Sequence, residues 1–151
     1  MDNIQELYQE MILEHNRNPR NFKVLEAPTH TAHGINPLCG DDYHVHLKIS
    51  DKNILEDISF HGDGCAISKS SGSMMTRFLK GKSIDELILI KDAFLSLLTE
   101  ENPNHQDNIL ENLVIFKGVK EFPVRVKCAT LVWRALEAAL SQKNGGEVTT
   151  E

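Results

Sequence analysis

The sequence predicts an α+β fold in which a small three-stranded antiparallel sheet packs against five or so helices. Residues that alternate between apolar and polar from 43 to 60 predict a pair of strands, and apolar residues at helical spacing predict helices before and after that pair. A chain of 151 residues suits one domain around one hydrophobic core. We expect that domain to cover residues 1–143, with a flexible C-terminal tail over residues 144–151.

The first helix is expected near the start of the sequence and should end by about residue 18, ahead of Pro19. Its apolar residues recur at intervals of three and four positions: Ile4, Leu7, Tyr8, Met11 and Ile12. Residues 21–38 are polar, contain two prolines and show no periodicity, so we expect a long connection there. One strand of the sheet is assigned to this stretch, with residues 28–36 as the candidate segment.

Residues 43–49 alternate between apolar and polar side chains, which predicts a half-buried strand. A turn at residues 51–53 and a second strand over residues 55–60 complete a hairpin. His44 and His46 share the polar face of the first strand and form a possible metal pair, but we interpret that face as solvated surface. His61 lies near a candidate site, and the remaining histidines are expected on the surface: His15, His30, His33 and His105.

Three further helices are predicted after the hairpin, and a weaker one near residues 107–116. The first covers residues 65–80 and ends at Gly81. The second continues to about residue 98 and begins after Ser83, because Ser83 and Glu86 have the spacing of a capping box. The last begins at Phe122-Pro123, since proline suits the first turn of a helix.

The composition argues against several classes of protein. The net charge is −6 and basic residues are spread along the chain, which argues against a nucleic-acid partner. No apolar stretch is long enough to span a bilayer, and no secretory signal is evident, so we expect a cytoplasmic protein without a membrane partner. Three cysteines cannot all pair in disulfides, which favours a reducing compartment.

Each of the three cysteines lies at the edge of a predicted element. Cys39 precedes the first clear strand, Cys65 opens a helix after a glycine-rich turn, and Cys128 lies in the first turns of the last helix. Edges and loops carry functional sites more often than core interiors do. A thiol near a helix N-terminus also has a lowered pKa, which favours the thiolate form.

Three thiolates and one carboxylate can fill the tetrahedral shell that Zn²⁺ prefers. Asp41 follows Cys39 by two residues, so in an extended segment both side chains point to the same side, whereas Asp42 points away. The cysteine spacing contains no CxxC pair and is not that of a zinc finger. The alternative is three buried core thiols, since free cysteine often packs as a small hydrophobe.

Four segments are similar to motifs of a known family: Pro37-Leu38-Cys39-Gly40-Asp41, Gly62-Asp63-Gly64-Cys65-Ala66-Ile67-Ser68, Ser70–Thr76, and Arg125-Val126-Lys127-Cys128-Ala129. They resemble the IscU/NifU-like iron–sulfur cluster assembly family, and most closely its SufU branch, over about residues 4–141. The resemblance implies that Cys39, Asp41, Cys65 and Cys128 bind zinc. It also implies a pyridoxal-phosphate cysteine desulfurase of the SufS kind as partner, which passes persulfide sulfur to Cys39.

The sequence differs from scaffold members of that family in ways that are similar to SufU. Lys127 stands where the scaffold has histidine, Cys65 is shifted by two residues, Phe122-Pro123-Val124-Arg125 replaces the chaperone-binding motif, and residues 83–121 are longer. We therefore interpret the chain as a sulfur carrier rather than a free-standing enzyme. The alternatives are a scaffold on which an iron–sulfur cluster is assembled and a domain whose zinc is purely structural.

The resulting hypothesis is a zinc-ligand exchange. A ligand from the desulfurase takes the place of Cys39 on zinc, and the freed Cys39 thiolate attacks the outer persulfide sulfur. The sulfur then passes to a downstream acceptor or cluster scaffold. Arg125 and Lys127 are candidates for stabilising thiolate or persulfide charge, with solvated surface residues as the alternative.

Overall fold

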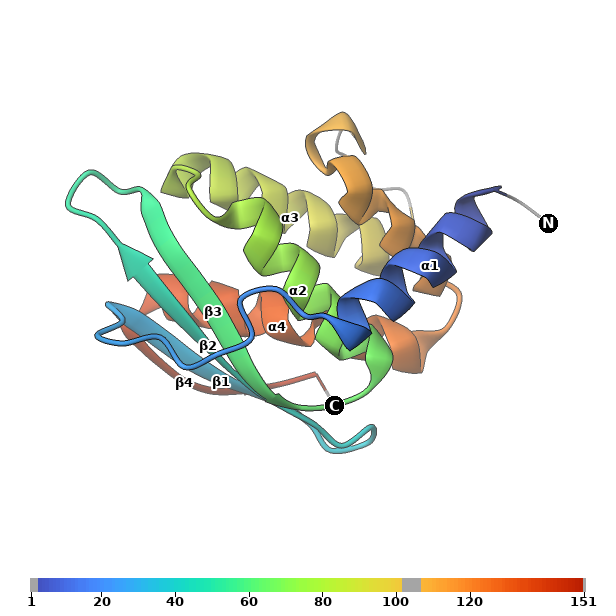
Figure 1. Cartoon of the computed structure of the whole chain (residues 1–151), viewed down its shortest axis with the longest axis horizontal. Coiled ribbons are helices and arrows are strands. Elements are labelled where there is room, and N and C mark those ends of the chain that lie inside the picture. Colours follow the sequence, from blue (N-terminus) through green and yellow to red (C-terminus); the bar gives the residue numbers. More distant parts are fainter. Residues whose placement is uncertain (1–2, 102–106, 151) are drawn as a thin grey trace.

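The computed structural model describes residues 3–101 and 107–150, and it places the helices on one face of a four-stranded sheet (Figure 1). No helix in these residues is long and apolar enough to cross a membrane. The elements in chain order are α1 (Asn3–Arg17), β1 (His30–Asn36), β2 (Asp41–Ile49), β3 (Leu55–Asp63), α2 (Ala66–Leu79), α3 (Ile84–Thr99), the 3₁₀ helices η1 (Asp107–Ile109) and η2 (Glu111–Val119), α4 (Pro123–Ser141) and β4 (Asn144–Thr149). The predicted α+β class is therefore confirmed.

The sheet has one strand more than the sequence predicted. Its order is β3-β2-β1-β4, in which β1, β2 and β3 are antiparallel neighbours and β4 runs parallel to β1. Residues 144–149 form β4, where the sequence predicted a C-terminal tail and no strand. Gly145 lets the chain turn back closely beside α4. A side chain would not fit there, because a Cβ at this position would lie only 2.7 Å from the backbone of Ala138. A glycine-rich polar segment carries no alternation, which is why its sequence did not predict a strand.

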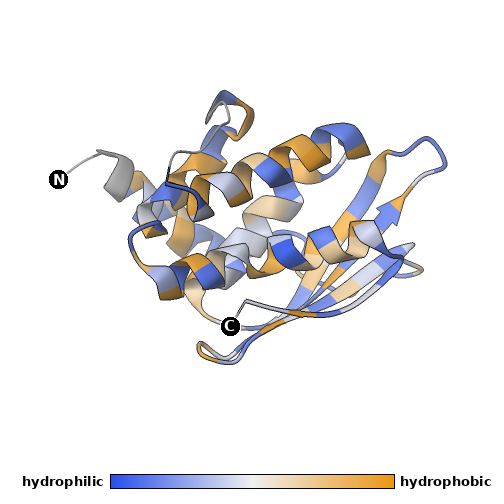
Figure 2. Cartoon of the chain, turned by 180° about the vertical axis from the view of Figure 1, so that it is seen from behind, coloured by the Kyte–Doolittle hydropathy of each residue, from blue (hydrophilic) through white to orange (hydrophobic). Residues whose placement is uncertain are grey.

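The core lies between the sheet and the helices. Tyr43, Val45 and Leu47 of β2 have no exposed surface, while the polar residues between them point to the opposite face. Figure 2 shows this alternation along the strands. Gly72 lets helix α2 approach β3 closely, since a Cβ at this position would lie 2.6 Å from the ring of Phe60. The small side chains of α2 therefore bring its N-terminus against the sheet.

The helix boundaries follow local signals in the sequence. Ser83 is the N-cap of α3 and accepts a hydrogen bond from the backbone N–H of Glu86 at 3.2 Å, as the capping box predicted. Pro123 occupies the first turn of α4, as predicted. The weaker helix expected near residues 107–116 is instead two 3₁₀ segments, η1 and η2.

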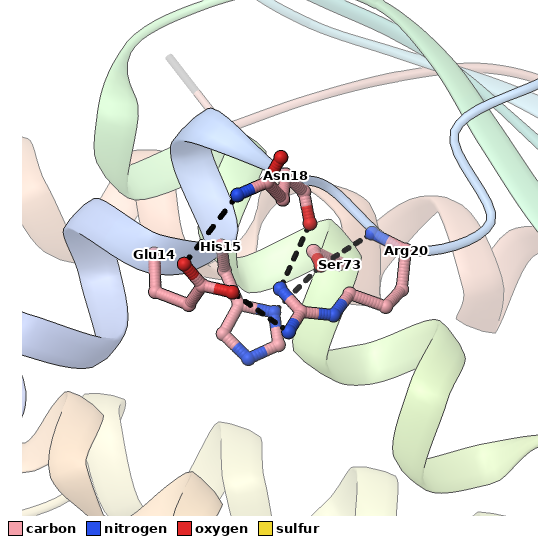
Figure 3. A network of polar contacts seen from close by, with 5 residues as sticks. All are labelled: Glu14, His15, Asn18, Arg20 and Ser73. Atoms are coloured by element: carbon pink, nitrogen blue, oxygen red, sulfur yellow. Dashed lines mark hydrogen bonds and ion pairs between the residues drawn. The ribbon is translucent and has the colours of Figure 1, made fainter.

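His15 is buried, and the expectation that it lies on the surface was wrong, while the same expectation for His105 falls outside the described residues. Its ring is 2% exposed and its Nδ1 lies 2.7 Å from Ser73 Oγ, which also accepts the backbone N–H of Arg20 at 2.8 Å (Figure 3). The Arg20 guanidinium in turn pairs with Glu14 at 3.0 Å. This network attaches the end of α1 to the middle of α2.

Burial, with the positive charges of Arg20 and Arg77, lowers the pKa of His15 to about 4. A histidine kept neutral in the folded chain stabilises it fully above the unfolded pKa of about 6.5, and this contribution falls as the pH drops towards 4. We expect His15→Gln to flatten the acid side of the stability profile by on the order of 3 kcal/mol at most. Urea unfolding between pH 4 and 7.5 measures this difference.

The matched control is His30→Gln. The pKa of His30 is also lowered by burial, but His30 lies near Lys143 at the start of β1 rather than in the helix interface. Its replacement should change the slope much less. Equal slopes for the wild type and His15→Gln would contradict the account of His15.

Candidate metal centre

Three separate elements bring the cysteines together. Cys39 lies in the turn between β1 and β2, Cys65 is the N-cap of α2, and Cys128 lies in the second turn of α4. Ligand atoms of Cys39, Asp41 and Cys128 all lie within 4.8 Å of one another. Cys65 lies beside this group: its backbone N–H donates to Asp41 Oδ1 at 3.0 Å, and the interaction of its thiol with that of Cys128 lowers its pKa. The structure thus brings Cys39, Asp41 and Cys128 together, with Cys65 bonded to Asp41 next to them.

Asp41 is the charged centre of this group, and only 2% of it is exposed. One carboxylate oxygen, Oδ1, accepts hydrogen bonds from Cys65 N and Ser68 Oγ, each at 3.0 Å. The other oxygen, Oδ2, is buried without a hydrogen-bond partner in residues 3–101 and 107–150. An unpartnered buried carboxylate oxygen is costly, so this atom is suited to bind a cation.

The glycines that flank Asp63 are required by close packing around the carboxylate. Gly62 has a φ of +143°, and a Cβ there would lie 2.0 Å from the backbone oxygen of Asp42. A Cβ at Gly64 would lie 2.6 Å from each of three polar atoms, on Asp41, Ser68 and Tyr43. The predicted glycine-rich turn therefore exists because the backbone passes directly over the site.

The thiols share protons unequally. The hydrogen bond from Cys128 lowers the pKa of Cys65 to about 6, and further hydrogen bonds from Ser68 act in the same direction against the effect of burial. The same hydrogen bond, with burial, raises the pKa of Cys128. Of this pair, Cys65 therefore has the greater tendency to ionise, in agreement with its predicted place at a helix N-terminus.

Three polar residues of the site were not predicted from the sequence. Asn36 is fully buried and its amide donates to Cys128 Sγ at 3.8 Å. Ser68 Oγ lies 3.0 Å from the Asp41 carboxylate and 3.2 Å from the Tyr43 hydroxyl. Asn36 has no motif around it, and its role follows only from its pairing with Asp41 across the β1–β2 hairpin.

The other candidates lie outside the cysteine group. Arg125 is exposed, with its guanidinium 4.6 Å from the centre of the Phe122 ring. Lys127 lies in a groove between α4 and β4. Neither side chain has a hydrogen bond or ion pair with a cysteine in the described part of the chain. His61 stacks on His44 and His46 on the outer face of the sheet.

Comparison with known proteins gives a consistent family. The NifU-like N terminal domain matches residues 7–142. The zinc-dependent sulfurtransferase SufU of Bacillus subtilis is 39% identical over 95% of this chain and 96% of its own length. The iron–sulfur cluster assembly scaffold protein IscU of Streptococcus pyogenes is 33% identical over 100% of this chain and 93% of its own.

Solved structures agree with the sequence relatives. A candidate iron–sulfur cluster assembly scaffold of the SUF system from Fervidobacterium islandicum superposes with a TM-score of 0.82. It is 28% identical, and the match covers 90% of this chain and 98% of that one. The fold and the length of this chain are thus those of the same group of proteins.

The packing over Asp41 can be tested with Gly64→Ala. The added methyl group should push the Asp41 and Ser68 side chains away, because each is the movable end of a side chain 2.6 Å from the new atom. We expect the affinity for Zn²⁺ to fall by at least about tenfold, because the residues that hold the ligands in place would be displaced. A chelator competition titration measures it.

Gly118→Ala is the matched control, since its added Cβ would meet only the Tyr8 ring at 3.5 Å, an ordinary contact. That variant should keep the wild-type affinity. Unchanged Zn²⁺ affinity in Gly64→Ala would mean that the carboxylate position does not matter for metal binding.

Proposed function

The chain belongs to the NifU-like N-terminal domain family, and from this premise we propose that it is a zinc-dependent sulfur-transfer protein of iron–sulfur cluster assembly. The relative named a zinc-dependent sulfurtransferase supports the activity, and the IscU relatives support the process. The observation that carries the proposal is the close group of Cys39, Asp41 and Cys128, with Cys65 bonded to the same carboxylate, whose Oδ2 has no hydrogen-bond partner in the described residues.

Cys39, Asp41, Cys65 and Cys128 are the proposed zinc ligands. Their donor set suits four-coordinate Zn²⁺, and the unpartnered Asp41 Oδ2 supplies the oxygen. Bound zinc would keep all three thiols deprotonated and hold them together. Asn36 and Ser68 orient the ligands through hydrogen bonds to Cys128 and Asp41, as outer residues of metal sites commonly do.

Cys39 is the proposed sulfur acceptor because it is the thiol that can leave the group. It lies half-buried in a turn, beside Leu38, which is 63% exposed. Cys128 is buried within a helix, and Cys65 is the N-cap of α2, where its sulfur accepts the Ser68 N–H at 3.4 Å. Movement of Cys39 changes one turn, whereas movement of the others disturbs a helix.

The transfer balances without an added oxidant. A pyridoxal-phosphate cysteine desulfurase of the SufS kind would present a cysteine persulfide. A ligand from that partner would replace Cys39 among the residues that hold the zinc ion. The Cys39 thiolate attacks the outer sulfur, forming a new S–S bond on Cys39 as the donor's S–S bond breaks. The donor cysteine leaves as a thiolate, and the proton stays on the transferred sulfur.

The surface around Cys39 suits a protein partner. Leu38, Phe122 and Val124 are large apolar side chains that remain exposed near the turn and at the start of α4. Arg125 and Lys127 are proposed to pair with the persulfide charge in the complex rather than to shape the free site. The persulfide then passes to a downstream acceptor or cluster scaffold.

The second candidate function is a scaffold for an iron–sulfur cluster. It is favoured by the IscU relatives and by the fact that thiolates also bind iron. Metal analysis after anaerobic purification separates the two. Stoichiometric zinc supports the sulfur carrier, and a coloured, labile cluster supports the scaffold.

Asp41→Asn tests the carboxylate ligand. The amide keeps an oxygen for the Cys65 N–H and the Ser68 hydroxyl, but it replaces Oδ2 with a group that cannot bind zinc. We expect Zn²⁺ affinity to fall at least about tenfold. The metal-free protein should be equally or more stable, since a buried unpaired charge is removed. Lost stability without zinc, or unchanged affinity, would contradict the assignment.

Cys39→Ser tests the acceptor. The variant should lose sulfur uptake from ³⁵S-labelled desulfurase persulfide, because a serine hydroxyl cannot replace the thiolate as nucleophile. Leu38→Ala is the neighbouring control and should keep Cys39 competent for labelling once the desulfurase is in excess. Circular dichroism and zinc content show whether each variant is folded and loaded. Full labelling of Cys39→Ser would remove Cys39 from this role.

A further inference from the structure

A row of titratable side chains crosses the outer face of the sheet, opposite the helices. The strand register places His33 of β1 beside His44 of β2, and His44 beside His61 of β3. Their rings stack with centres 4.2 and 5.0 Å apart. Glu147 of β4 lies beside His33 at the other end of the row. Four strands therefore each contribute one residue to a single line.

One end of this row has the arrangement of a metal site. His33 Nε2 lies 2.6 Å from Asp42 Oδ1, and ligand atoms of His33, Asp42 and His44 all lie within 4.8 Å of one another. The second ring nitrogen of His33, Nδ1, lies 3.2 Å from Glu147 Oε2. Histidines that bind metals commonly donate their other N–H to a carboxylate, which fixes the ring and strengthens the ligand.

We propose that His33, Asp42 and His44 form a second site for a divalent transition-metal ion, oriented by Glu147. Two imidazoles and a carboxylate are ligands that Zn²⁺ and its neighbours accept, with solvent in the fourth position. The ion replaces the proton between His33 Nε2 and Asp42 Oδ1. His44 is half-buried, and one of its ring nitrogens lies within 4.8 Å of the ligand atoms of His33 and Asp42.

This site is separate from the cysteine group. Asp41 and Asp42 are consecutive residues of β2, so their side chains point to opposite faces of the sheet. Asp41 is buried among the cysteines, whereas Asp42 is exposed and contacts His33. His33, His44 and Glu147 also line a surface pocket of about 370 Å³, which gives an ion access from solvent. The two sites can therefore be emptied independently.

The test is a Zn²⁺ titration of ¹⁵N-labelled full-length protein, followed through the imidazole resonances. Beyond the equivalent taken by the cysteine group, we expect saturable shifts of the His33 and His44 rings. His33→Gln and Asp42→Asn should each weaken this step at least about tenfold, since each removes a ligand. Asp41→Asn, the matched neighbour, should leave it unchanged.

His61→Gln is the control on the same face, because His61 stacks on His44 but lies outside the three-ligand group. It should keep the binding step. The proposal is overturned if excess Zn²⁺ leaves the His33 and His44 resonances in place. It is equally overturned if His61→Gln weakens binding as much as His33→Gln, which would point to the stack rather than to a ligand set.

Discussion

The hydrogen bonds between Asp41 and the first turn of α2 are the constraint on which the site depends. The carboxylate at the start of β2 accepts hydrogen bonds from the Cys65 N–H and the Ser68 hydroxyl, so it joins the beginning of this strand to the N-terminus of α2. A negative group at that position is favoured by the helix dipole as well. Because one oxygen is used in this way, the second is left for the proposed ligand role, and the thiols of Cys39 and Cys128 lie within 4.8 Å of the carboxylate.

The close packing around this carboxylate explains the small residues of the surrounding chain. Gly64 leaves room for the polar atoms beneath it, and Gly72 lets α2 rest against Phe60. In such close packing a shift of a few tenths of an ångström already changes the contacts. A metal site requires its ligands to be positioned with similar precision. The glycines and serines of residues 62–73 therefore serve geometry more than flexibility.

The sequence predicted the parts of the site whose signal is local. The cysteines at element edges and the choice of Asp41 over Asp42 follow from motif position and strand alternation. The register between β1 and β2 places Asn36 beside Asp41 and His33 beside His44. No local sequence pattern indicates which residues of the two strands become neighbours. β4 was missed for a similar reason, since its pairing comes from the open edge of β1 rather than from its own residues.

The three thiols are chemically alike, so the different roles proposed for them must come from how each is held. Cys128 is buried in α4, where its movement would open a packed core at a cost of about 2–5 kcal/mol. Cys65 caps α2, and its loss would remove a helix cap as well as a ligand. Cys39 follows the exposed Leu38 in a short turn, where Gly40 has a φ of +72° and open space around it. The proposed release of one sulfur while an ion stays bound would therefore disturb the fold least at Cys39, in the turn between β1 and β2.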